Sequence, residues 1–162
     1  MGVSGSAAQN ENQMNKLTNN HAPVKCSKSI LIHATPQEVW NILTNIDQWD
    51  NWQTDIRKPK LMGELKPNTR FDWETGGAKI RSTLHTVQPY KEIGWTGETF
   101  GARAIHNWTI AEVDGATQVS VDECMEGLMT WLFKDLFNKN LAKGMQHWLE
   151  LLKAKCEDTY RR

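Results

Sequence analysis

Apolar and polar residues alternate through most of the stretch from residue 71 to residue 126, which is the pattern of antiparallel β-strands with one buried face. Short turn sequences interrupt this alternation at Gly76-Gly77, Pro89-Tyr90, Thr99-Phe100 and Asp114-Gly115. Asp-Gly between two apolar runs is a strong signal for a two-residue hairpin. The pattern therefore predicts a meander of consecutive strands joined by tight turns.

Turn positions also predict which side chains share a face, because successive side chains of a strand point to opposite sides of the sheet. The Asp114-Gly115 turn pairs Trp108 with Val121 and His106 with Glu123. The other turns pair Trp73 with Ile80, Leu84 with Trp95, Trp95 with Ala104, and Ile93 with His106. Every hairpin then places its apolar residues on one common face, which predicts a single continuous curved sheet.

Helices are predicted on both sides of the meander. A strand over residues 24–33 is followed by Thr35-Pro36 and Glu38, a capping sequence that favours a short helix, and by a second short helix or turn near residues 47–52. Apolar residues recur at helical spacing from Phe133 to Leu152, which predicts one long helix over about residues 130–156. A helix of that length would cross the concave face of the sheet.

Composition narrows the class of protein. The 19 basic and 19 acidic side chains balance, no cluster of Lys and Arg is present, and no apolar run would span a membrane, so neither a nucleic-acid partner nor integral membrane association is expected. The first 22 residues are polar and predict a disordered tail, and residues 23–160 predict one domain. The N-terminus has no secretion signal, so a cytoplasmic location is expected.

Cofactor and metal motifs are missing from the sequence. The three cysteines form no CxxC pair, the five histidines show no ligand spacing, and GxGxxG, P-loop and HExxH patterns do not occur. We therefore expect no cofactor and no metal site. The eight tryptophans are unusual for 162 residues and predict a packed aromatic core or an aromatic cavity.

Two segments carry a resemblance to a known family. The sequence Ile32-His33-Ala34-Thr35-Pro36-Gln37-Glu38-Val39-Trp40 resembles the opening motif of the START/birch-pollen-allergen (SRPBCC) superfamily, and Ile46 to Trp52 resembles its continuation. The resemblance is to the polyketide cyclase/dehydrase-like branch and spans about residues 24 to 157. It implies an α+β helix-grip fold, in which a curved antiparallel sheet wraps around a long C-terminal helix and two short helices follow the first strand.

The resemblance also implies a cavity between sheet and helix for an apolar small molecule that is lipid-like, polyketide or aromatic. We expect the ligand to contact Trp73, Ser82, Trp95, His106, Trp108, Glu123, Met125, Phe137 and Leu141. Two alternatives stay open: an enzyme of the cyclase/dehydratase type, and a protein-interaction module of the co-chaperone type, which an exposed apolar patch outside the cavity would favour. The superfamily has no universal catalytic motif, and a monomer or weak homodimer is expected.

His106 and Glu123 are the candidate catalytic residues for the enzyme alternative. Both are ionisable, and both fall on the face that otherwise carries tryptophans and aliphatic side chains. Burying such groups costs several kcal/mol unless they are paired or hydrated. Two interpretations remain open: the two side chains hydrogen-bond only each other in the core, or they form a polar contact at the floor of a ligand cavity. The aromatic surroundings slightly favour the second.

Overall fold

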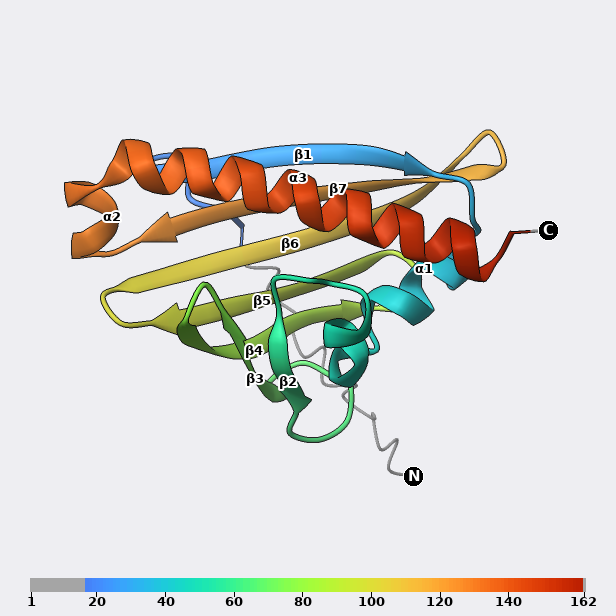
Figure 1. Ribbon diagram of the computed structural model, residues 1–162, viewed down its shortest axis with the longest axis horizontal. Helices are drawn as coiled ribbons and strands as arrows, with labels where there is room; N and C mark the ends of the chain where they lie inside the picture. The colour runs from blue at the N-terminus through green and yellow to red at the C-terminus, as the bar shows by residue number, and fades with distance from the viewer. Residues whose placement is uncertain (1–16, 162) are drawn as a thin grey trace, which may run out of the picture.

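The computed structural model describes residues 17–161 and shows an antiparallel sheet curved around a long helix (Figure 1). In chain order the elements are β1 (Val24–Ile32), α1 (Pro36–Leu43), the 3₁₀ helix η1 (Ile46–Asn51), β2 (Arg57–Leu61), β3 (Arg70–Thr75), β4 (Ala78–Gln88), β5 (Glu92–Thr99), β6 (Ala102–Val113), β7 (Ala116–Glu126), α2 (Leu128–Leu132) and α3 (Lys134–Thr159). The sheet has the strand order β1-β7-β6-β5-β4-β3-β2. The predicted helix-grip architecture is thereby confirmed.

Helix α1 begins where the sequence places it. The Thr35 side chain accepts a hydrogen bond from the Glu38 backbone N–H, and the Glu38 carboxylate accepts one from the Thr35 N–H, which completes a capping box. Pro36 occupies the first helical turn, where a missing N–H costs nothing. Trp40 of this helix is buried and belongs to the core.

The hairpin between β6 and β7 has the predicted register. His106 lies opposite Glu123, and Trp108 lies opposite Val121. Val113 and Ala116 flank a turn in which Asp114 and Gly115 both have positive φ, the geometry that a two-residue hairpin needs. The pairing of Trp73 with Ile80 across the Gly76-Gly77 turn is likewise confirmed.

The observed register between β5 and β6 differs by two residues from the predicted one. The turn is formed by Phe100 and Gly101, because Gly101 adopts the φ of +74° that glycine tolerates best. Trp95 therefore pairs with His106, and Ile93 pairs with Trp108. A shift of two residues leaves every side chain on its predicted face, so His106 still points inward.

The loop between β4 and β5 is one residue longer than predicted. Gln88 pairs with Glu92, so Pro89, Tyr90 and Lys91 form the loop. An irregularity in the ladder between Leu84 and Thr86 absorbs the extra residue. Beyond that bulge, Leu84 pairs with Trp95 as the sequence predicts.

The C-terminal helix is broken, which corrects the prediction of one continuous helix from residue 130. Phe133 has non-helical dihedral angles and separates α2 from α3. No residue of α3 before Met145 is buried, and the buried side chains follow from there: Met145, Trp148, Leu149, Leu152 and Cys156. Phe133, expected in the buried stripe, is 49% exposed, because the helix start extends past the side chains of the sheet that could cover it.

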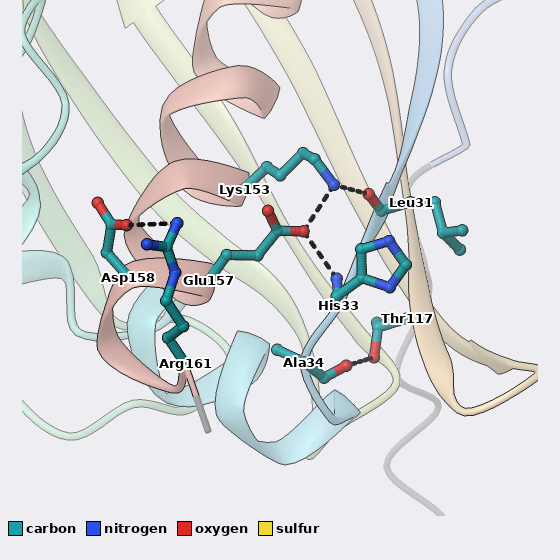
Figure 2. Close-up of polar contacts among 8 residues, drawn as sticks. All are labelled: Leu31, His33, Ala34, Thr117, Lys153, Glu157, Asp158 and Arg161. Carbon is teal, nitrogen blue, oxygen red and sulfur yellow. Dashed lines mark hydrogen bonds and ion pairs between the residues drawn. The ribbon is translucent and has the colours of Figure 1, made fainter.

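Polar contacts fix the C-terminal half of α3 to the end of β1 (Figure 2). Lys153 Nζ donates to the backbone carbonyl of Leu31 at 2.6 Å and to the Glu157 carboxylate at 2.6 Å. The same carboxylate accepts the His33 backbone N–H at 2.9 Å. The helix is thus bound to the strand edge by a connected set of hydrogen bonds as well as by its apolar side chains.

Part of the predicted tail contacts the sheet. Within residues 17–22, the Asn19 N–H donates to Sγ of Cys124 at 3.3 Å, and the Lys25 ammonium donates to the Asn20 carbonyl. Cys124 points away from the concave face but is buried beneath this segment. The rest of the predicted disordered tail, residues 1–16, lies outside the described residues.

Candidate functional site

A cavity of about 310 Å³ lies between the concave face of the sheet and α3. Its floor consists of inward-facing residues of the strands: Trp73, Ile80, Gly97, Ala104, His106, Trp108, Val121, Glu123 and Met125. α3 covers it with Asn140, Leu141, Gly144, Met145 and Trp148, and the segment after η1 closes one side with Gln53, Asp55 and Ile56. The volume and the mainly apolar lining are typical of a site for a small molecule.

One end of the cavity is filled by a cluster of aromatic rings. Trp49 of η1 is fully buried at its centre, and its indole N–H donates to the Leu43 carbonyl at 2.9 Å. Its ring lies 5.6 Å from Phe71 and 5.3 Å from Trp148, both with edge-to-face geometry. Trp49 does not line the cavity, so it is a structural residue that fixes the position of the tryptophans that do.

The only ionisable pair at the floor of this cavity, among the residues that the structure describes, is His106 with Glu123. The distance from His106 Nδ1 to Glu123 Oε2 is 3.0 Å, and each side chain is 9% exposed. The imidazole also stacks on the indole of Trp95, with ring centroids 5.1 Å apart and planes inclined by 21°. Hydrogen bonding on one edge and stacking on one face therefore fix the orientation of the His106 ring.

Burial controls the charge of this pair. Loss of hydration lowers the pKa of His106 to about 3, with a smaller contribution from His85, and raises the pKa of Glu123 to about 8. At neutral pH the favoured state is a neutral imidazole beside a protonated carboxyl group. Ring Nε2 of His106 and the second oxygen of Glu123 retain hydrogen-bonding capacity in that state. The pair can thus contact an uncharged polar group of a ligand.

We expect the free energy of unfolding to fall between pH 6.5 and 8 in the wild type, relative to a Glu123→Gln variant. In the unfolded chain Glu123 loses its proton near pH 4.5, whereas in the folded protein it keeps the proton up to a pH of about 8. The unfolded state then binds fewer protons, so stability falls as pH rises, by at most about 1.4 kcal/mol per pH unit.

His106 acts in the opposite direction, but only below its ordinary pKa of 6.5, so the slope above pH 6.5 belongs to Glu123. Urea unfolding of both proteins at a series of pH values measures the difference. Parallel curves for wild type and Glu123→Gln across this range would show that Glu123 is already ionised in the fold.

Six of the nine residues predicted to contact the ligand line the cavity: Trp73, His106, Trp108, Glu123, Met125 and Leu141. The other three do not line it. Ser82 is buried and accepts a hydrogen bond from the Trp73 indole at 3.0 Å, so it positions a lining residue. Trp95 lies behind His106, and Phe137 belongs to the helix start outside the cavity.

Sequence reasoning missed Gly144 and the segment from Gln53 to Ile56. Gly144 is exposed at the cavity edge, and a Cβ atom placed on it would meet no atom within 4 Å, so this position has room for a larger side chain. A glycine in a helix interior costs about 1 kcal/mol relative to alanine, which is a signal that the sequence does carry. No comparable signal marks Gln53 or Asp55.

The described residues contain no group of three or more His, Cys, Asp or Glu side chains that could hold a metal ion. No helix within residues 17–161 is long and apolar enough to cross a membrane.

Solved structures with 14 to 17% sequence identity to this chain have a similar fold. A hypothetical protein from Helicobacter pylori has 17% sequence identity and a TM-score of 0.76, covering 88% of this chain and 99% of that chain. A START superfamily protein from Mycobacterium smegmatis has 15% identity and a TM-score of 0.67, covering 83% and 98%. The two-domain aromatase/cyclase of the steffimycin biosynthetic pathway has 14% identity and a TM-score of 0.73, covering 86% and 52%.

No curated protein matches the sequence. The family described as polyketide cyclase/dehydrase and lipid transport matches residues 23–157, which is most of the chain. That match agrees with the helix-grip architecture and with the START-type neighbours. The chain belongs to the polyketide cyclase/dehydrase and lipid transport family.

Proposed function

We propose that the protein binds an apolar small molecule carrying one uncharged polar group, held in the cavity between the sheet and α3. The observation that carries this proposal is the cavity of about 310 Å³, with apolar walls and the His106–Glu123 pair as the ionisable pair at its floor. Desolvation of the apolar walls supplies the affinity, and the pair supplies the orientation. A carboxylate ligand is disfavoured, because its charge would be buried without a cationic partner.

Filling the cavity at Gly144 is expected to weaken ligand binding by more than about tenfold. Gly144→Leu adds a side chain to the open space that Gly144 lines, so it competes with the ligand without displacing packed atoms. Gly144→Ala is the matched control, since one methyl group leaves most of that space free and favours the helix. Titration with the fluorescent probe N-phenyl-1-naphthylamine measures the affinity of each variant.

Equal affinity of the probe for Gly144→Leu, Gly144→Ala and wild type would mean that the probe binds elsewhere. Thermal unfolding of the same samples provides the check on folding, because Gly144→Leu is expected to remain as stable as Gly144→Ala. If Gly144→Leu melts at a lower temperature than Gly144→Ala, Ala104→Leu takes its place in the experiment. Ala104 lines the floor, so a leucine there fills the cavity from the sheet side.

A second candidate function is an enzyme of the cyclase/dehydratase type, and the His106–Glu123 geometry favours it. The protonated carboxyl group of Glu123, oriented by the His106 ring at 3.0 Å, can donate a proton at a fixed position in a cavity. The cavity would hold a flexible chain in one reactive conformation. Loss of turnover in His106→Ala with binding and folding retained would support this candidate over simple binding.

A further inference from the structure

An exposed apolar surface lies at one end of the molecule. It consists of six side chains, which we call the rim patch: Phe100, Leu128, Trp131, Leu132, Phe133 and Leu136. Phe100 is 97% exposed and Trp131 is 65% exposed. Large apolar side chains clustered in this way on a surface usually mark a site of contact with another protein or with a membrane.

The residues of the rim patch belong to segments that touch one another. Phe100 occupies the turn between β5 and β6, and the other five lie in α2 and around the start of α3. A Cβ atom at the neighbouring Gly101 would come within 2.9 Å of the Met129 side chain, so α2 rests directly on that turn. Figure 1 shows α2 and the β5–β6 turn at the same end of the molecule.

The rim patch is continuous with the edge of the cavity. Thr99 and Ala102, on either side of the turn that carries Phe100, line the cavity. Leu141 also lines it, and Asn140 reaches it from the same helix one turn after Phe137. Any partner that contacts the rim patch therefore also lies next to the opening of the cavity.

Lysine side chains lie along the first half of α3, the helix that begins at the rim patch. Lys134, Lys139 and Lys143 are exposed on the first half of α3, and none forms an ion pair with the residues that the structure describes. Asp135 is the one acidic residue between residues 128 and 143, and Glu126, just before α2, accepts a hydrogen bond from the Asn19 side chain and lies opposite Arg103. Across the opening, Glu98 is compensated by Arg103 at 3.9 Å. The surface thus combines Trp, Phe and Leu with a net excess of lysine.

We propose that the rim patch docks onto an anionic lipid surface. Trp, Phe and Leu side chains next to lysines match the chemistry of a membrane interface, where rings enter the headgroup region and ammonium groups contact lipid phosphates. A second copy of this chain fits less well, because a symmetric contact would place the three lysines of each copy close to one another. The docking does not depend on the proposed function, but the two together mean that the apolar ligand enters and leaves at the membrane.

Vesicle co-sedimentation of the full chain tests the docking. We expect binding to phosphatidylcholine vesicles that contain phosphatidylglycerol, and weaker binding to phosphatidylcholine alone or at high salt. The double variant Trp131→Ser/Phe133→Ser should lower partitioning by about tenfold or more. Lys139→Gln should lower it by about fivefold on anionic vesicles and have no effect on neutral ones.

Val113→Ser is the matched control, because Val113 is 40% exposed beside the β6–β7 turn at the opposite end of the molecule. It should bind vesicles as the wild type does. N-phenyl-1-naphthylamine titration without vesicles should give wild-type affinity for the rim variants, since the substituted residues do not line the cavity. Vesicle binding without probe binding would therefore refute the proposed function and leave the docking intact.

Two results would overturn the docking. The first is failure of the wild type to sediment with anionic vesicles. The second is a dimeric mass by light scattering that returns to the monomeric mass in Trp131→Ser, which would make the rim patch an interface between copies of the chain.

Discussion

Ending the chain after Lys143 is expected to abolish the cooperative thermal transition. This truncation removes the buried part of α3, which carries Met145, Trp148, Leu149, Leu152 and Cys156. Each large apolar side chain contributes about 1.5–3 kcal/mol when buried, so their sum rivals the typical net stability of about 5–15 kcal/mol. The hydrogen bonds of Lys153 and Glu157 to the end of β1 are lost as well.

Circular dichroism in the near ultraviolet measures the effect, because the tryptophan cluster dominates that signal. Leu132→Ser at the end of α2 and Leu136→Ser in the exposed start of α3 are matched controls, and each should change the free energy of unfolding by about 0.5 kcal/mol or less. A truncated protein with a sharp transition and a native tryptophan spectrum would show that the sheet folds without its helix.

Replacing His106 by alanine is expected to lower the free energy of unfolding by about 2–4 kcal/mol at neutral pH. The substitution leaves the buried Glu123 carboxyl group without its partner at 3.0 Å and opens a space against the Trp95 ring. Urea unfolding gives the stability, and probe titration of the same sample gives the affinity. The result separates two roles of the pair.

If His106 and Glu123 only hydrogen-bond each other, the free energy of unfolding falls and the folded variant binds the ligand with unchanged affinity. If it contacts the ligand, affinity for a ligand with a polar group falls, whereas affinity for a purely apolar one persists. A double variant, His106→Leu/Glu123→Leu, is the control, since replacing both partners by apolar groups should recover much of the lost stability. Unchanged stability and affinity in His106→Ala would mean that the pair is hydrated.

Turn residues explain why so much of the fold could be predicted from the sequence. Asp114-Gly115 and Gly76-Gly77 each permit one hairpin geometry, and the parity of their pairings fixed the inner face of the sheet. The β5–β6 turn was misplaced because Thr99, Phe100 and Gly101 allow more than one turn, and the choice depends on contact with α2. The residues of the turn alone do not indicate the contact between Gly101 and Met129 of α2.

The candidate site was predictable to the extent that it follows from strand parity. The opposition of His106 and Glu123 came directly from the Asp114-Gly115 turn. The space lined by Gly144 depends on the distance between α3 and the sheet, which no local pattern reports. The exposure of Phe133 was missed for a related reason, since helical periodicity continues past the point where the sheet ends.

The division of α3 into a buried half and an exposed half has an evolutionary consequence. Contacts of the second half hold the core together, whereas residues 134 to 143 contribute little buried surface but include part of the cavity lining. Substitutions in the first half can therefore change which ligands fit without exhausting the stability margin that natural proteins maintain. Along this one helix, Met145 and Trp148 serve both the cavity and the core, whereas the residues before Gly144 are freer to change with the ligand.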